Sequence, residues 1–124
     1  MLAGNSAYIP VTPSVEYLVI AGGGSGGNYS GNAGAGGGGA GGFRTATGYA
    51  VTAGSPITVT VGAGGGAVQN NIIGNYGSDS VFGTITSVGG GRGAYYATSK
   101  NGGNGGSGGG ANGPATASGG SPTS

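Results

Sequence analysis

Few residues in this 124-residue chain could carry acid–base chemistry. The only carboxylates are Glu16 and Asp79, and the chain has no histidine and no cysteine. General acid–base catalysis needs a titrating side chain that is tuned by a neighbouring group. Glu16 falls in a predicted strand and Asp79 in a predicted loop, where its side-chain oxygen is expected to cap a turn. The sequence therefore predicts no catalytic residue, and we expect the protein not to be an enzyme.

Metal, cofactor and nucleic-acid sites are not predicted either. Zinc sites need cysteine or histidine ligands, and the single carboxylate in "GSDS" is too little for a tight calcium site. Glycine-rich phosphate loops of the Walker type end in Gly-Lys-Ser/Thr, a tripeptide that is absent here. The three cations, Arg44, Arg92 and Lys100, are scattered, and the formal net charge is only +1. No apolar run approaches the roughly 18–20 residues of a membrane span.

The tyrosines are the side chains best suited to binding. Tyrosine offers a large contact area at low entropy cost. One hypothesis is that rings beside glycine-rich stretches cover bare backbone, and the other is that they contact sugars or a partner subunit. Two predicted loops, Val68–Ser78 and Ala94–Lys100, carry the contact candidates. These are Asn75, Tyr76, Tyr95 and Tyr96.

One modification site is suggested by the sequence. Asn28 begins "NYS", which fits the acceptor pattern for N-linked glycosylation. The pattern is short, and its use depends on the source of the protein. Asn28 is therefore kept as a possible glycan acceptor.

The elements that would position these residues are strands followed by glycine tracts. Glycine makes up 37 of the 124 residues, against roughly 7% in average proteins. Apolar β-branched runs at Val15–Ile20, Ile57–Val61 and Ser80–Val88 each lead directly into glycine. We expect Val15–Ile20 to be central, and Ile57–Val61 to be half-buried and to form a hairpin with Tyr49–Thr52. No run has a helical apolar period, so the predicted fold class is all-β with almost no helix.

The glycine tracts have a period of their own. In "NGGNGGSGGG" (101–110), the residues other than glycine recur every third position, and "GGSGGN" (23–28) repeats this spacing. The polyproline II helix has three residues per turn and no internal hydrogen bonds. Two of its three edges would here be bare backbone, which allows neighbouring rods to pack and to bond to each other. The sequence therefore predicts short antiparallel strands that feed a bundle of polyglycine II rods, although a flexible spacer remains the alternative.

The order of these blocks resembles a known family. "VEYLVIAGGGSGG", "VTAGSPITVTVGAGGG", "GSDSVFGTITSVGGGRG" and "NGGNGGSGGG" resemble the glycine-rich domain of bacteriophage tail-fibre and adhesin proteins over roughly residues 15–113. The resemblance implies a small β-structure with packed polyglycine II helices. It also implies receptor binding by loops at the tip of this sandwich. The loops of this chain are short by comparison.

These observations define the expected organisation and function. We expect an arm or linker over residues 1–13, a glycine-rich domain over 14–113 and a low-complexity tail over 114–124. The first functional hypothesis is a tail-fibre or adhesin module of a virion tail or the extracellular space. It would self-associate and would bind a host-surface glycan or outer-membrane protein. The alternative is the subunit of a self-assembling extracellular filament.

Overall fold

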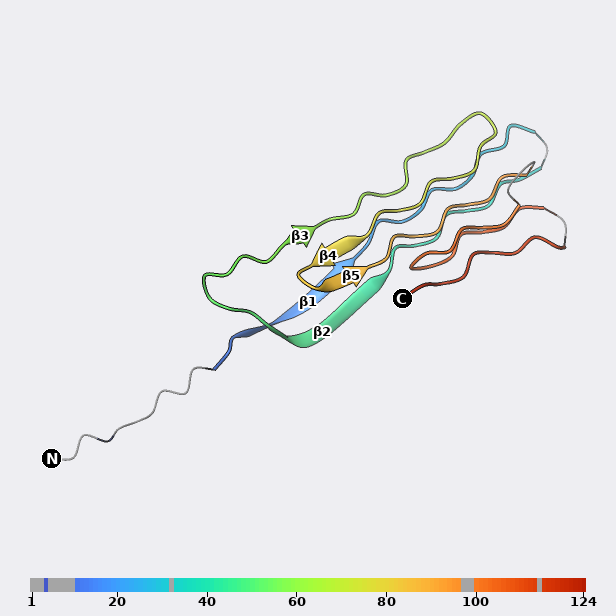
Figure 1. The fold of residues 1–124 in the computed structure, drawn as a ribbon. Coiled ribbons are helices and arrows are strands. Elements are labelled where there is room, and N and C mark those ends of the chain that lie inside the picture. The colour runs from blue at the N-terminus through green and yellow to red at the C-terminus, as the bar shows by residue number, and fades with distance from the viewer. Residues whose placement is uncertain (1–3, 5–10, 32, 97–99, 114) are drawn as a thin grey trace.

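A computed structural model describes residue 4 and residues 11–31, 33–96, 100–113 and 115–124. Within these ranges the chain forms strands, turns and extended segments but no helix, which confirms the predicted all-β class. Figure 1 shows the strands at one end of an elongated molecule, with wavy glycine-rich segments that run side by side from them to the other end. The strands are β1 (Ser14–Ile20), β2 (Phe43–Ala50), β3 (Val59–Thr60), β4 (Ser80–Phe82) and β5 (Ile85–Ser87).

The strands form two small antiparallel sheets. β1 pairs with β2, so that Ile20 lies opposite Phe43 and Ser14 opposite Ala50. The second sheet has the order β3-β4-β5. The turn from β4 to β5 contains Gly83 at a φ of +57°, a left-handed conformation that glycine adopts without a steric penalty. The inner faces of the two sheets pack together, since β1 contacts both β4 and β5.

Glycine tracts continue the strands and are joined by hydrogen bonds at every third residue. In the tract 21–28, which follows β1, the amides of residues 21, 24 and 27 donate to the carbonyls of residues 42, 39 and 36. The amides of residues 22, 25 and 28 donate to a second tract, at the carbonyls of residues 78, 75 and 72. This repeat is that of a threefold rod whose successive edges face different neighbours. The period of three in the sequence thus corresponds to a structural repeat.

The tract 88–94, which follows β5, lies in the middle of the bundle. It accepts bonds from the tract 36–42 and donates bonds to the tract 21–28, for example from Gly90 N to Gly22 O at 2.8 Å. It also bonds to the tract 72–78 and to residues 103–110. Its buried residues are Gly89, Gly90, Gly91, Gly93 and Ala94. The centre of this domain is therefore built from backbone, with buried N–H groups paired between neighbouring tracts of the same chain, as a packed interior requires.

Glycine is required at specific positions because neighbouring carbonyls occupy the place of a side chain. A Cβ on Gly36 would lie 2.0 Å from Gly110 O, and one on Gly91 would lie 2.0 Å from Gly103 O. A Cβ on Gly37 would meet no atom within 4 Å. The tract 36–42 therefore has closed edges that exclude a methyl group and an open edge that accepts one.

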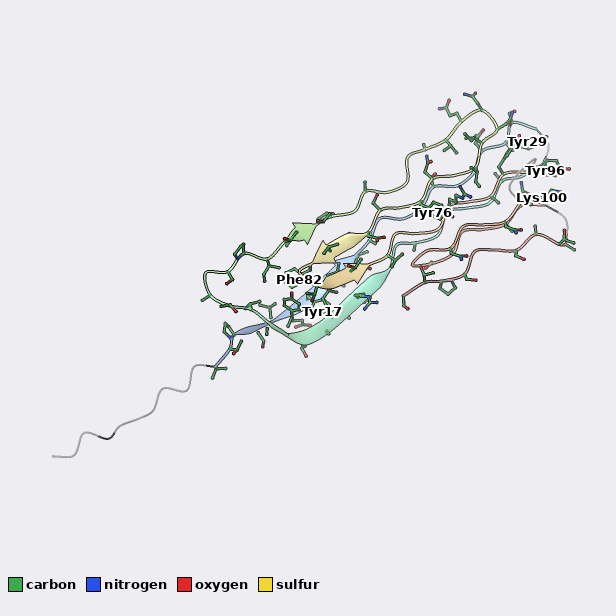
Figure 2. The ribbon with its side chains drawn as sticks, viewed as in Figure 1. Tyr17, Tyr29, Tyr76, Phe82, Tyr96 and Lys100 are labelled. Carbon is green, nitrogen blue, oxygen red and sulfur yellow. The ribbon has the colours of Figure 1, made fainter. Side chains whose placement is uncertain are left out.

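The strand end contains a small core of packed side chains. Tyr17, Tyr49 and Phe82 form an aromatic cluster between the sheets, with ring centroids 5.0 Å apart for Tyr49 and Phe82 and 6.1 Å apart for Tyr17 and Tyr49. Figure 2 shows Tyr17 and Phe82 together among the strands. Buried apolar side chains are few among the described residues, namely Val19, Ala21 and Ala94.

Three strand predictions were wrong. The segment Tyr49–Thr52 forms no hairpin with Ile57–Val61, because β2 pairs with β1 and β3 pairs with β4. Val59 and Val61 are not half-buried but 62% and 85% exposed. Val15–Ile20 is not central, because among the described residues it has a single partner strand, in a two-stranded sheet. Which strands pair depends on how the glycine tracts that continue them pack together. The alternation of apolar and polar residues within a strand carries no information about that packing.

The segment Ser80–Val88 is two strands rather than one, because the turn at Gly83 folds it into the β4–β5 hairpin.

Residues 118–123, in the segment that the sequence suggests is a tail, lie along the bundle. The amides of Gly102 and Gly105 donate to the carbonyls of Ser118 and Ser121, and Gly105 forms a parallel bridge with Pro122. Asn101 and Asn104 provide a second row of contacts, since their side-chain oxygens accept bonds from Ser118 N and Ser121 N at 3.0 and 2.8 Å.

Candidate functional site

The end of the bundle remote from the strands, here called the tip (residues 28–31, 68–72 and 95–96), carries a cluster of three tyrosines. The ring of Tyr29 lies 5.9 Å from that of Tyr95 and 5.4 Å from that of Tyr96, measured between centroids. Figure 2 shows Tyr29 and Tyr96 together at this end. Tyr96 is 43% exposed, so the cluster presents aromatic surface to solvent. The structure thus brings together two of the four contact candidates, Tyr95 and Tyr96.

Polar side chains hold the neighbouring turn in place at the tip. Asn70 and Asn71 have φ values of 63° and 60°, in the left-handed region that asparagine enters more readily than most residues. The side-chain oxygen of Asn71 accepts bonds from the backbone N and the hydroxyl of Ser30, at 2.7 and 2.9 Å. Asn71 N donates in turn to Asn28 Oδ1 at 3.3 Å. These bonds fix the turn beside Tyr29.

Asn28 has a structural role in this arrangement. Besides its side-chain contact with Asn71, its backbone amide donates to Ile72 O at 2.9 Å. The residue is half-buried at the end of the tract 21–28. Its glycosylation stays a prediction.

Asn75 and Tyr76 lie away from the tyrosine cluster. Residues 72–78 form a rod of the bundle, so only the first part of the predicted loop Val68–Ser78 lies at the tip. Asn75 N donates to Ser25 Oγ at 2.8 Å, and Asn75 Nδ2 donates to Gly66 O at 3.0 Å. Tyr76 is 49% exposed and lies under the guanidinium of Arg92, whose central carbon is 5.0 Å from the ring centroid. Of the predicted loop Ala94–Lys100, residues 97–99 lie outside the described residues.

Asp79 does not cap a local turn as expected. Its carboxylate accepts a bond at 2.7 Å from the amide of Gly89, ten residues later in the sequence. Bonds to a charged acceptor are stronger than neutral ones. Asp79 therefore links the start of β4 to the beginning of the central tract.

Two relevant residues were not among the predicted contacts. In the sequence, Tyr29 is one of the rings that lie beside glycine-rich stretches, and Arg92 is one of the three scattered cations. Tyr29 reaches Tyr95 because the tract 21–28 runs parallel to the tract 88–94, to which it is bonded through Gly22 and Ser25. The signal in the sequence is the dipeptide "NY" (28–29) at the end of the period-three repeat 23–28, because it places an aromatic ring at the end of a rod.

The fold defines a class of protein in which short strands feed a bundle of threefold glycine rods. A family model described as a glycine-rich domain matches residues 2–124, and the chain belongs to this family. No curated protein and no solved structure matches the chain significantly. In the described part of the chain, no helix is long and apolar enough to cross a membrane.

Proposed function

We propose that this protein is a non-enzymatic structural and adhesion module of the phage tail-fibre or adhesin type. It would act at a virion tail or in the extracellular space, by self-association and by attachment to a surface. The observation that carries the proposal is the cluster of half-buried Tyr29 and Tyr95 with exposed Tyr96 at the end of an elongated bundle. The partner class is a host-surface glycan or an outer-membrane protein.

The architecture supports an attachment role. Binding residues gain precision when rigid elements hold them, and the three tyrosines lie where two bonded tracts end. Aromatic rings are enriched among the residues that dominate binding interfaces. Since the tip is remote from the strands, it can meet a surface while the strand end contacts other subunits.

The strand end supports the self-association part of the proposal. Leu18, Ile20 and Phe43 are 58%, 54% and 64% exposed. The register of β1 and β2 places these three residues on one face of the two-stranded sheet, because Ile20 lies opposite Phe43. Exposed apolar patches on small proteins often mark interaction sites.

A cell-binding assay tests the attachment proposal. Fluorescently labelled protein is incubated with a panel of Gram-negative and Gram-positive cells, and bound label is measured by flow cytometry. We expect binding to some strains, and a loss of at least tenfold with Tyr96→Ser. Val61→Ser, a change at an 85% exposed residue of the strand end, is expected to keep full binding. Absence of binding to every strain, or equal loss in both variants, would contradict the proposal.

The second candidate function is a subunit of a self-assembling filament. The observation that favours it is β3, an edge strand of the three-stranded sheet with exposed Val59 and, next to it, exposed Val61. Unpaired edges are templates for strand addition by another copy. Electron microscopy of the purified chain distinguishes the two functions. Long filaments from this chain alone would favour the subunit function, whereas discrete particles that bind cells would favour the adhesin.

A further inference from the structure

A groove with a volume of about 530 Å³ runs along the side of the bundle, and it contains most of the positive charge of the protein. Tyr76, Arg92 and Lys100 line it, together with Asn101, Gly103 and Asn104. These residues come from the tracts 72–78 and 88–94 and from the segment 100–104. Figure 2 places Tyr76 midway along the bundle and Lys100 nearer the tip.

The groove is suited to an anion. The chain has three cations and two carboxylates. Two of these cations, Arg92 and Lys100, line the groove, and neither Glu16 nor Asp79 does. The Nε atom of Arg92 is buried and has no hydrogen-bond partner among the described residues. A buried donor without a partner costs free energy, which a bound acceptor would recover once the Arg92 side chain moves to expose this atom.

The other polar groups of the groove are amides held in a fixed orientation. Asn101 and Asn104 use their Oδ1 atoms to accept bonds from Ser118 N and Ser121 N. Their Nδ2 groups, which can each donate two hydrogen bonds, bond to none of the described residues. Donors of this kind recognise hydroxyl and carboxylate oxygens.

Glycine at position 103 allows the aromatic part of the groove to form. A Cβ on Gly103 would lie 2.7 Å from Tyr76 Cε1 and 2.7 Å from Arg92 Cγ. Both side chains therefore lie directly on the backbone of a buried glycine. Tyr76 remains 49% exposed and offers an apolar surface next to the cations.

We propose that this groove binds an acidic saccharide, in which a pyranose ring carries a carboxylate. The planar guanidinium of Arg92 suits a carboxylate, Lys100 adds charge, and the amides suit ring hydroxyls. The Arg92 guanidinium covers one face of the Tyr76 ring, and the exposed part of the ring offers apolar surface to the sugar. The inference rests on the proposed attachment function, for which it supplies a class of surface ligand. It concerns residues separate from the tyrosine cluster at the tip, so the two are tested separately.

Isothermal titration calorimetry with trigalacturonate as the probe tests the site. We expect saturable binding of trigalacturonate and no detectable binding of maltotriose, a neutral trisaccharide. Lys100→Gln should weaken binding about tenfold, and Arg92→Gln should abolish it. The matched control is Arg44→Gln, which removes the same charge from β2, outside the groove, and should change the affinity less than twofold. Circular dichroism reports whether each variant is folded, and Lys100 is exposed, so its variant keeps the test decisive if Arg92→Gln fails to fold.

Three results would overturn the inference. Equal affinity for maltotriose would show that the carboxylate is not recognised. Displacement of trigalacturonate by an equal concentration of inorganic phosphate would show a general anion site without sugar recognition. Equal weakening by Arg44→Gln would show attraction by net charge. If trigalacturonate binds while Tyr96→Ser has no effect on cell binding, the groove stands and the proposed role of the tip fails.

Discussion

The strand end and the glycine bundle of this molecule are stabilised by different groups. At the strand end, Tyr17, Tyr49 and Phe82 form a small core of side chains. In the glycine bundle, the buried tract 88–94 contacts its neighbours through backbone N–H and C=O groups. A side-chain core tolerates changes of shape by repacking. A backbone core cannot repack in this way, because a carbonyl oxygen occupies the place where a Cβ would go.

The largest expected effect comes from a single methyl group in the bundle. Gly36→Ala places a Cβ 2.0 Å from Gly110 O, so the rods must separate, and we expect a loss of at least about 3 kcal/mol in the free energy of unfolding. Gly37→Ala is the matched control, because its Cβ meets nothing within 4 Å. We expect the control to stay within about 1 kcal/mol of the parent protein, with a small gain from the stiffer unfolded chain. Urea unfolding followed by circular dichroism measures both; similar losses for the two variants would contradict the closed-edge description.

The next effect concerns the side-chain core. Phe82→Ala removes the ring that contacts both Tyr17 and Tyr49. Because Phe82 is only half-buried, we expect a loss of about 2 kcal/mol rather than the 3–5 kcal/mol of a fully buried ring. Phe43→Ala, at a 64% exposed ring on β2, should cost less than about 1 kcal/mol. If both variants lose the same stability, the aromatic cluster is not the core of the strand end.

The junction between the two ends depends on Asp79. Asp79→Ala removes the acceptor for Gly89 N, a bond of 2.7 Å, and we expect a loss of about 1–2 kcal/mol. The other carboxylate, the exposed Glu16 on β1, serves as the control, and Glu16→Ala should change stability by less than about 0.5 kcal/mol. Thermal unfolding measures the difference in stability. An Asp79→Ala variant as stable as the parent protein would show that this bond does not stabilise the junction.

The smallest expected effect is local, at residues 118–121. Asn104→Ala removes the side-chain acceptor of Ser121 N and should cost about 1 kcal/mol. Hydrogen exchange at the amide of Ser121 measures this effect, and we expect it to be faster in the Asn104→Ala variant. Ser107→Ala is the control from the same period-three motif, since the side chain of Ser107 is exposed. Unchanged exchange at Ser121 in the Asn104 variant would show that the asparagine row does not hold this segment.

Part of this structure could be predicted because it depends on local chemistry. Asn101 and Asn104, three apart in "NGGNGGSGGG", indicated a threefold rod with one side-chain edge, and both side chains bond to the same neighbouring segment. The series does not extend to Ser107 in one rod, because residues 103 and 106 run antiparallel to the central tract whereas residues 107–110 run parallel to it. Nothing in the glycine spacing marks that reversal.

The candidate site is harder to predict from the sequence, because it depends on which tracts become neighbours. Tyr95 and Tyr96 were named, but their contact with Tyr29 follows from the parallel alignment of two tracts far apart in sequence. The approach of Tyr76, Arg92 and Gly103 likewise joins three segments. Bare backbone edges allow many pairings, so composition alone does not select one.

Amide hydrogen exchange along the tract 36–42 shows whether the core of this domain consists of threefold glycine rods. In this tract, the amides of residues 36, 39 and 42 donate to carbonyls of the central tract, whereas the amides of residues 37, 38, 40 and 41 bond to none of the described residues. A threefold rod predicts slow exchange at residues 36, 39 and 42 and fast exchange at the four others, measured by NMR. Uniformly fast exchange would show a flexible spacer, and protection at every second residue would show a strand; either result would contradict a core of threefold glycine rods.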